Sequence, residues 1–206
     1  MIDLRKISSV KLFYIKLVDR NCINDFICKY HYSKSVNGVK SKYCFALFYN
    51  EIIIGAAILA APATPGVSQK YSNGNELVEI RRLCCIDFTP KNTESYFIGQ
   101  IMKWLKNNTN IDIILSYADP YFGHSGVIYK ATNFKKIGKT KKRKVYFYKG
   151  KEYHEKALRT RYNGTLKPYS AELRMAKQEG LLQEKVRPGK HIFIYNLSKN
   201  KEYKLK

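Results

Sequence analysis

The alternation of apolar and polar positions predicts a series of short strands and helices. A helix is expected over residues 21–30, where apolar side chains recur at helical spacing after a capping asparagine. Residues 43–49 and 52–59 are expected to pair as a hairpin, with a possible bulge at Gly55. Further strands are expected at 77–86, 111–117 and 144–148, and further helices at 95–107 and 125–132. This order predicts an α/β fold with a mixed sheet, antiparallel early and with parallel crossovers late.

The pattern changes in two places. Residues 61–75 are rich in proline, glycine and serine and are expected to form a loop. Beyond residue 150, a helix over 169–182 and a last strand over 191–197 are expected to form a small appendage. We therefore expect a main domain at 1–150 and a basic appendage at 151–206 that packs on it.

Charge is distributed unevenly along the chain. The 206 residues hold 38 Lys and Arg against 16 Asp and Glu, a formal net charge of +22. Residues 135–206 alone hold 22 of these cations and 6 of the acids, a net charge of +16. Such an excess favours an anionic partner, either nucleic acid or a membrane surface. The longest apolar run, residues 52–61, is far shorter than the roughly 20 residues that span a bilayer, so no membrane partner is expected.

The densest cationic run is interleaved with tyrosine and phenylalanine. Cations for phosphates beside aromatic faces for bases are typical of nucleic-acid contact, although a solvated basic hairpin would show a similar composition. The expected nucleic-acid contacts are Lys139, Lys141, Lys142, Arg143, Lys144, Arg159 and Arg161.

The cysteines and the first residues indicate the compartment. Five cysteines, an odd number without C-x-x-C spacing, argue against a disulfide framework and a zinc ribbon. The first residues show no secretory signal pattern. We expect reduced, mostly buried thiols and a cytoplasmic protein.

The segment before the expected helix at 95–107 offers an anion site. A helix start presents unpaired backbone N–H groups and the positive end of the helix dipole. Asn92, Thr93 or Ser95 could cap this helix and also contact a phosphate. Many helices begin with such residues and bind nothing, so the alternative is an ordinary cap.

Three segments resemble a known family. They are His31-Tyr32-Ser33-Lys34, Val78-Glu79-Ile80-Arg81-Arg82-Leu83 and the stretch 116–134, which contains Asp119-Pro120, Gly123-His124 and Ile128-Tyr129. The end of the last segment resembles the GCN5-related N-acyltransferase fold. Together the segments resemble the phage Mom family of DNA-modification proteins, divergent members of that superfamily. The resemblance implies modification of the exocyclic amino group of adenine in double-stranded DNA, giving a carbamoylmethyl adduct that protects phage DNA from restriction.

The resemblance also implies roles for individual residues. The catalytic candidates are Asp119, Glu79, Arg82, His31, Tyr32 and Tyr129, and the substrate-binding candidates are Ser33, Tyr117, Tyr121, His124 and Ser125. Tyr129 stands where acyltransferases place a tyrosine that protonates the leaving group. A bulge in the strand at 77–86, common in this superfamily, would re-aim Glu79 and Arg82. Structural alternatives stay open: a Glu–Arg pair within the strand, an Asp-Pro turn, a tyrosine in the core and a histidine at a helix end.

The sequence leaves more than one choice for the molecule that donates the transferred group and for the macromolecular partners. The superfamily uses acyl-coenzyme A, for which Asn92, Thr93 and Ser95 are the candidate contacts, but the usual glycine-rich loop is missing. An aminoacyl-tRNA donor, and hence tRNA as a second partner, is therefore also considered. Potential metal ligands at His31, Tyr32, Asp119 and His124 match no defined spacing, so no metal site is assigned. The rival functions are acyl transfer to a protein amine or RNA, and a non-catalytic nucleic-acid-binding module. The expected setting is the cytosol of a bacterial host, with a phage or prophage as the source.

Overall fold

The chain forms two compact units. The computed structural model describes residues 7–64, 66–72 and 74–197. The first unit contains the described residues up to 118 together with 126–138 and 192–197, and the second contains 119–125 and 139–191. Residue 150, the expected domain boundary, lies inside the second unit. The residues immediately before it, from 139 onward, belong to this unit and not to the first.

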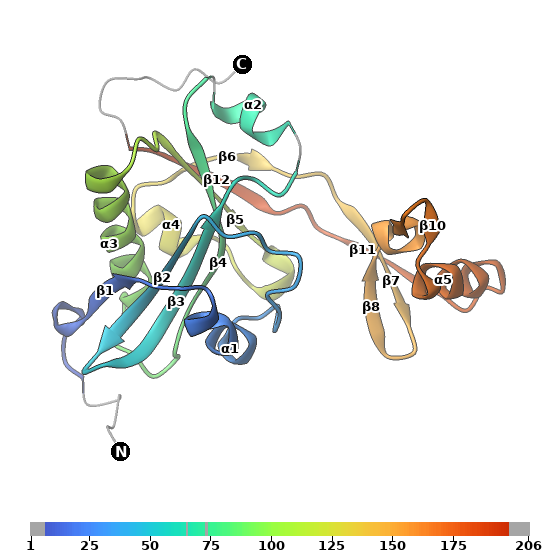
Figure 1. Ribbon diagram of the computed structural model, residues 1–206, viewed down its shortest axis with the longest axis horizontal. Helices are drawn as coiled ribbons and strands as arrows, with labels where there is room; N and C mark the ends of the chain where they lie inside the picture. Colours follow the sequence, from blue (N-terminus) through green and yellow to red (C-terminus); the bar gives the residue numbers. More distant parts are fainter. Residues whose placement is uncertain (1–6, 65, 73, 198–206) are drawn as a thin grey trace. The chain divides into compact units, whose positions relative to one another are not determined.

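A seven-stranded mixed sheet is the framework of the first unit (Figure 1). Its strands, in spatial order, are β1 (Tyr14–Leu17), β2 (Tyr43–Tyr49), β3 (Ile52–Ala60), β4 (Leu77–Cys85), β5 (Ile113–Ala118), β12 (His191–Asn196) and β6 (Lys135–Lys139). Pairing is antiparallel from β1 to β4 and parallel between β4 and β5. The expected mixed α/β fold is thus confirmed.

Helices cover both faces of this sheet. The helices of the first unit are α1 (Asn21–Tyr30), α2 (Val67–Ser72), α3 (Thr93–Asn108) and α4 (Val127–Ala131), with a short 3-10 helix at Val10–Leu12. Successive residues of β2 point to opposite faces: Phe45 packs in the core with α3 and α4, whereas Ala46 packs with α1. Figure 1 shows α1 and α3 on opposite sides of the sheet.

Most of the expected elements of this unit are present. The helix at 21–30 is confirmed, and the hairpin forms with Ile54 out of register immediately before Gly55. The expected loop at 61–75 was wrong in part, because residues 67–72 form α2 and bury Tyr71 against Leu77. A six-residue helix carries too little periodicity to stand out against the turn-forming residues around it.

Gly126 precedes α4 in a conformation that glycine alone adopts easily. Its φ is 84°, and a Cβ there would lie 2.2 Å from the ring of Phe193, a fully buried residue of β12. We expect Gly126→Ala to lower the free energy of unfolding by about 2 kcal/mol or more, from backbone strain and overpacking. Urea unfolding measures this. Gly99, with open space around its Cβ position, gives the control Gly99→Ala, which should not destabilise the protein.

The second unit has a sheet and a core of its own. Its elements are a three-stranded sheet of β7 (Arg143–Tyr148), β8 (Lys151–His154) and β11 (Gln183–Arg187), the ribbon β9 (Arg161–Tyr162) with β10 (Thr165–Leu166), helix α5 (Pro168–Gln178) and the 3-10 helices η3 (Pro120–Phe122) and η4 (Glu155–Arg159). Tyr146, Leu158 and Leu173 form its buried core. The expected helix at 169–182 is present as α5, but the expected last strand is β12 and completes the sheet of the first unit.

The cysteines agree with a reduced state. All five thiols are free, and Cys44, Cys84 and Cys85 are buried. Burial raises the pKa of the Cys84 thiol to about 12, so it stays protonated at neutral pH. Within the described part of the chain, no helix has the length and apolar character needed to cross a bilayer.

Candidate active site

Strands β4 and β5 pair over only a short stretch. Three residue pairs join them, from Leu77 with Ile113 to Glu79 with Leu115. Both strands continue beyond this point, β4 to Cys85 and β5 to Ala118. The site is built around the place where parallel pairing ends, because ligands of open α/β sheets bind at the carboxyl ends of the strands.

A bulge in β4 lies at the same place. Arg82 pairs with Ile58 and Ile80 pairs with Leu59, so Arg81 is an extra residue with no partner across the ladder. The bulge expected in this strand is confirmed. It changes the alternation after Glu79 and lets the two arginines that follow leave the regular faces of the sheet.

Glu79 is buried and paired. One carboxylate oxygen lies 3.4 Å from Nε of Arg81, and the other accepts a hydrogen bond of 3.1 Å from the backbone N–H of Ala63. Arg81 in turn donates to the carbonyl of Ala61. The structural pair considered for Glu79 is therefore formed with Arg81, and it holds the segment after β3 against β4.

A short segment after α1 carries the predicted histidine. His31 is 4% exposed, and its Nδ1 accepts from the backbone N–H of Ser33 at 3.1 Å. Because Nδ1 is an acceptor, the neutral ring carries its proton on Nε2. The Ser33 hydroxyl lies 2.8 Å from the same nitrogen and 3.2 Å from the carbonyl of Ser35, and it can donate its single proton to one of these two acceptors at a time. The ring of Tyr32 packs against the imidazole, with centroids 4.1 Å apart and ring planes tilted by 32°.

Arg82 of β4 is hydrogen-bonded to this segment. Its Nε donates to the carbonyl of Ser35 at 3.1 Å, and one terminal nitrogen donates to the carbonyl of Arg81 at 2.8 Å. Burial lowers the pKa of Arg82, while Tyr32 and Glu79 act in the opposite direction. The catalytic role of Arg82 stays a prediction, and its described contact with Ser35 positions the segment 31–35.

Tyr129 of α4 lies in the interior of the first unit. Burial raises the pKa of its phenol to about 12, the Ser116 side chain lowers it, and Tyr32 and Glu79 raise it further. The ring packs against Phe134 and Phe193. At neutral pH this phenol is protonated, which is the state that a proton donor requires.

Tyr117 of β5 belongs to the same electrostatic group. Burial raises its pKa first, followed by the charge of Glu79. The charge of Glu79 raises the pKa of Tyr117, Tyr129 and Arg82. Tyr32 raises the pKa of Tyr129 and Arg82. Five of the predicted residues of the first unit are thus within electrostatic range of one or more of the others.

The side chains expected to cap the start of α3 do not do so. Asn92 precedes the helix with φ 72°, and its side chain makes no cap hydrogen bond. The Thr93 hydroxyl is fully buried and donates to Pro90, and that of Ser95 donates to Asn92. Capping by these side chains was therefore wrong, and the groups that α3 offers to an anion are the backbone N–H groups of its first turn.

Asp119 lies in the second unit and is almost completely buried. Its carboxylate forms ion pairs with Arg143 at 3.1 Å and Lys190 at 3.2 Å, and it also accepts from the backbone N–H of Tyr121. These contacts make Asp119 an anchor between η3 and the strands. Its predicted catalytic role stays a prediction.

The other predicted residues around Asp119 are exposed. They are Tyr121, His124 and Ser125. Tyr121 stacks on the guanidinium of Arg187, 3.4 Å from the ring centroid, and the backbone N–H of His124 donates to the carbonyl of Asp119. No group of three or more potential metal ligands occurs among the described residues.

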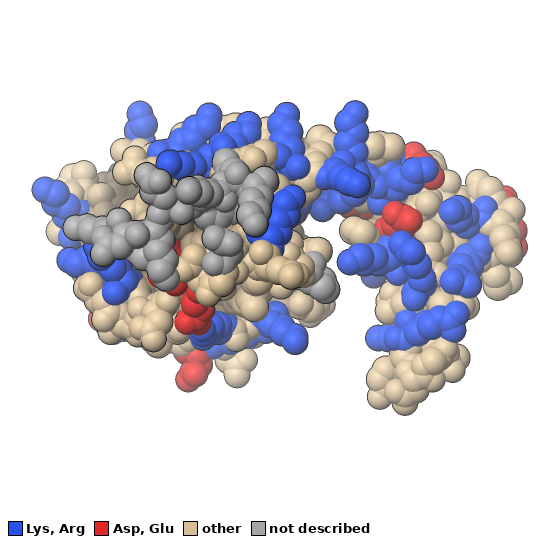
Figure 2. Space-filling model, turned by 90° about the horizontal axis from the view of Figure 1, so that it is seen from above, with Lys and Arg blue, Asp and Glu red and all other residues tan. Residues whose placement is uncertain are grey.

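The predicted nucleic-acid contacts all lie in the second unit, in which Lys139, the last residue of β6, begins the segment 139–191. Lys141 and Lys142 are exposed, Lys144 pairs with Glu184, Arg159 pairs with Glu155, and Arg161 donates to Gly164. The second unit holds 16 Lys and Arg against 6 Asp and Glu. Figure 2 shows Lys and Arg side chains spread over the surface of both units, with few Asp and Glu between them.

A family model matches nearly the whole chain. The match is to the Mom protein family and covers residues 12–206. This chain belongs to the Mom protein family. Among curated proteins, none matches the chain.

Solved structures show the fold of this Mom-family chain. Spermidine/spermine N-acetyltransferase SpeG from Vibrio cholerae superposes with a TM-score of 0.51 at 10% identity, covering 92% of this chain and 95% of that one. NAA60 from Arabidopsis thaliana, in complex with acetyl-CoA, gives 0.50 at 11% identity, covering 89% and 99%. The Mom-family chain therefore has the N-acetyltransferase fold that its closing segment resembles.

Sequence reasoning missed three contributors to the site in this Mom-family chain. Arg81 neutralises Glu79, the carbonyl of Ser35 receives Arg82, and Ser116 adjoins the phenol of Tyr129. Arg81 contributes because of the bulge, and Ser35 contributes through its backbone carbonyl. Neither a bulge nor a carbonyl can be recognised from the type of the residue. Ser116 is the polar exception in the apolar run of β5, and a buried hydroxyl in such a strand is the signal that could have identified it.

Proposed function

We propose that this Mom-family protein is a transferase that modifies the exocyclic amino group of adenine in double-stranded DNA. Family membership together with the N-acetyltransferase fold supports a transferase. The observation that supports the finer proposal is the group of polar side chains near the end of the β4–β5 pairing, in which Glu79 and Tyr129 are buried and Tyr32 is partly exposed, formed by residues that resemble the Mom family. The proposed product is the carbamoylmethyl adduct, made in the host cytosol to protect phage DNA from restriction.

The acceptor sets physical requirements on such a site. An adenine amino group is a weak nucleophile within the base stack, so the base must be extruded and held by aromatic side chains. Tyr32 is partly exposed beside the buried His31. In the proposal, the exposed ring of Tyr32 stacks on the extruded base, while the Arg82–Ser35 hydrogen bond fixes the position of the segment that carries it.

A proton donor is the second requirement. The amino group loses a proton to solvent as the new bond to nitrogen forms, the bond between the transferred group and its carrier breaks, and the departing carrier atom takes up a proton. In the proposal, the neutral phenol of Tyr129 supplies the proton to the departing group. Burial is the main reason that the raised pKa keeps this phenol protonated, and the negative charge of Glu79 adds to the effect.

Acyl-coenzyme A is the donor that the fold favours, as in the acetyl-CoA complex of the Arabidopsis protein. Transfer from it joins the adenine nitrogen to the acyl carbonyl carbon, breaks the thioester bond and releases the thiol of coenzyme A. A glycyl group transferred in this way gives an isomer of the carbamoylmethyl adduct, so the proposed product then requires an isomerisation of that first adduct.

At the start of α3, the backbone provides the groups that would bind the pyrophosphate of this donor. Asn92 adopts the left-handed conformation that a glycine-rich loop would also supply, and the first-turn N–H groups of the helix suit a pyrophosphate. Glu94 in that turn opposes an anion, so binding would depend on backbone hydrogen bonds to offset its charge.

Nucleoside mass spectrometry tests the proposal. DNA from cells that express the protein should contain a mass-shifted deoxyadenosine, and its mass identifies the transferred group. DNA from cells that express the folded Tyr129→Phe variant at the same level should contain at least about a hundredfold less of it. Unmodified nucleosides from cells with well-expressed wild-type protein would contradict the proposal. Acylated protein or RNA in the same cells would identify a different acceptor.

A further inference from the structure

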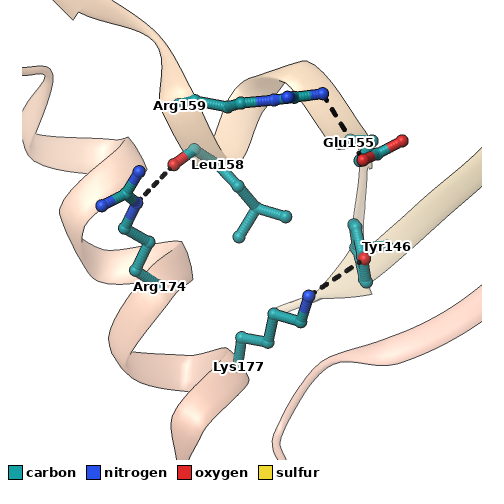
Figure 3. Close-up of a pocket in the computed structure, with 6 residues that line it drawn as sticks. All are labelled: Tyr146, Glu155, Leu158, Arg159, Arg174 and Lys177. Atoms are coloured by element: carbon teal, nitrogen blue, oxygen red, sulfur yellow. Dashed lines mark hydrogen bonds and ion pairs between the residues drawn. The ribbon is translucent and has the colours of Figure 1, made fainter.

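The second unit contains a pocket that the proposed chemistry does not use. Its volume is about 330 Å³, and it is lined by Tyr146, Glu155, Leu158, Arg159, Arg174 and Lys177 (Figure 3). The residues come from β7, η4 and α5, all within the second unit. The pocket can therefore be analysed without reference to the first unit.

Cations dominate this pocket. Three of its six side chains are positively charged and one is a carboxylate. Glu155 lies 3.5 Å from a terminal nitrogen of Arg159, and both side chains are about half exposed or more, so this contact is weak and easily exchanged. Lys177 and Arg174 have no carboxylate partner among the described residues of the pocket, and an anion would find uncompensated charge there.

The cations are held in place by contacts that leave donors available. Nε of Arg174 donates to the carbonyl of Leu158 at 2.7 Å, which leaves the terminal amino groups of the guanidinium for a ligand. Nζ of Lys177 lies 3.4 Å from the hydroxyl of Tyr146 and 5.3 Å from the centroid of its ring. Figure 3 shows the side chain of Leu158 pointing between Arg159 and Lys177.

A rigid base supports the arrangement. Tyr146 and Leu158 belong to the buried core of the unit together with Leu173 of α5. Arg174 and Lys177 are three residues apart on α5 and therefore share one face of the helix. Because Leu173 anchors α5 in this core, the backbone positions from which these two cations extend are fixed.

We propose that this pocket binds a backbone phosphate of double-stranded DNA, a proposal that rests on the proposed function. Arginine presents planar N–H pairs that match phosphate oxygens, and a lysine adds a point charge. The cavity is larger than one phosphate, so the neighbouring sugar would lie against Leu158. The excess of cations over the whole unit would attract the duplex, and the pocket would fix its position.

Binding of a fluorescent DNA duplex at several salt concentrations tests this proposal. The double variant Arg159→Gln, Lys177→Gln should bind at least about tenfold more weakly near 0.1 M salt, and its salt slope should fall by about 1, because the contact with one phosphate is lost. The matched control Lys149→Gln, Lys185→Gln removes the same charge from exposed positions of the same unit, outside the pocket. It should lose no more than about threefold.

Further measurements separate the possible failures. Equal losses in the pocket variant and the control would overturn the pocket assignment, and so would a loss of tRNA binding with duplex binding retained. Arg159→Gln alone changes a side chain that is 64% exposed, so a weaker duplex affinity in this variant cannot come from unfolding. Wild-type protein that binds the duplex but modifies no adenine would contradict the proposed function and leave the pocket result standing.

Discussion

Replacing Asp119 with alanine is expected to destabilise the second unit by about 2–4 kcal/mol. The carboxylate is 1% exposed and pairs with Arg143 and Lys190, whose side chains are about 30% exposed. Without it, two cations that share a buried partner would repel each other, and the backbone N–H of Tyr121 would lose its acceptor. Partial exposure of the cations limits the loss, because water can reach them.

Hydrogen exchange and urea unfolding measure the effect. Amide protons of β7, the strand that carries Arg143, should exchange faster in Asp119→Ala. The matched control is Glu184→Gln, which breaks the exposed pair with Lys144 on the same strand and should cost less than about 0.5 kcal/mol. An Asp119→Ala protein of unchanged stability that no longer modifies DNA would instead assign the carboxylate a catalytic role.

Tyr129→Phe is expected to lower the rate of modification at least about a hundredfold without loss of the fold. The substitution removes only the hydroxyl, and the ring contacts with Phe134 and Phe193 remain. Single-turnover rates on a DNA duplex measure it, with Tyr148→Phe, a half-buried tyrosine of the second unit, as the control. A Tyr129→Phe enzyme as fast as wild type would remove the phenol from the mechanism.

The same substitution predicts a pH dependence of stability. The pKa of Tyr129 rises from an ordinary value of 10 to about 12 in the folded protein. Its neutral phenol therefore contributes fully to stability below pH 10, and the contribution is lost as pH rises towards 12. Relative to Tyr129→Phe, wild-type protein should lose about 3 kcal/mol of unfolding free energy over that range. Equal pH profiles would show that the phenol is not held in its neutral form.

Long periodic elements of the fold could be predicted from the sequence. The helix at 21–30 and the hairpin that follows it have strong patterns and form as expected. Patterns of two to five residues, such as those of β9 and β10, are too short to distinguish from turns. The division into units could not be predicted, because it depends on β12 crossing back to a sheet whose neighbouring strands come much earlier in the chain.

The candidate site shows the same limit. The motif residues His31, Glu79, Arg82 and Tyr129 could be selected from the sequence, and the structure places them in one unit. Their hydrogen-bond partners could not be selected. Arg82 was selected as a catalytic candidate, and its described hydrogen bonds go to two backbone carbonyls, because the bulge at Arg81 redirects its side chain. The sequence shows which side chains can donate a hydrogen bond. Which acceptor each of them reaches depends on the local backbone geometry.

The place of β12 has a consequence for biosynthesis. This strand lies between β5 and β6, although the ribosome makes it more than fifty residues after both. Until residues 191–196 leave the exit tunnel, the facing edges of β5 and β6 have no partner and Phe193 cannot fill its place against Gly126. Nascent chains that stall before this point would expose strand edges prone to aggregation, so the yield of folded protein should depend on continuous translation and on early chaperone binding.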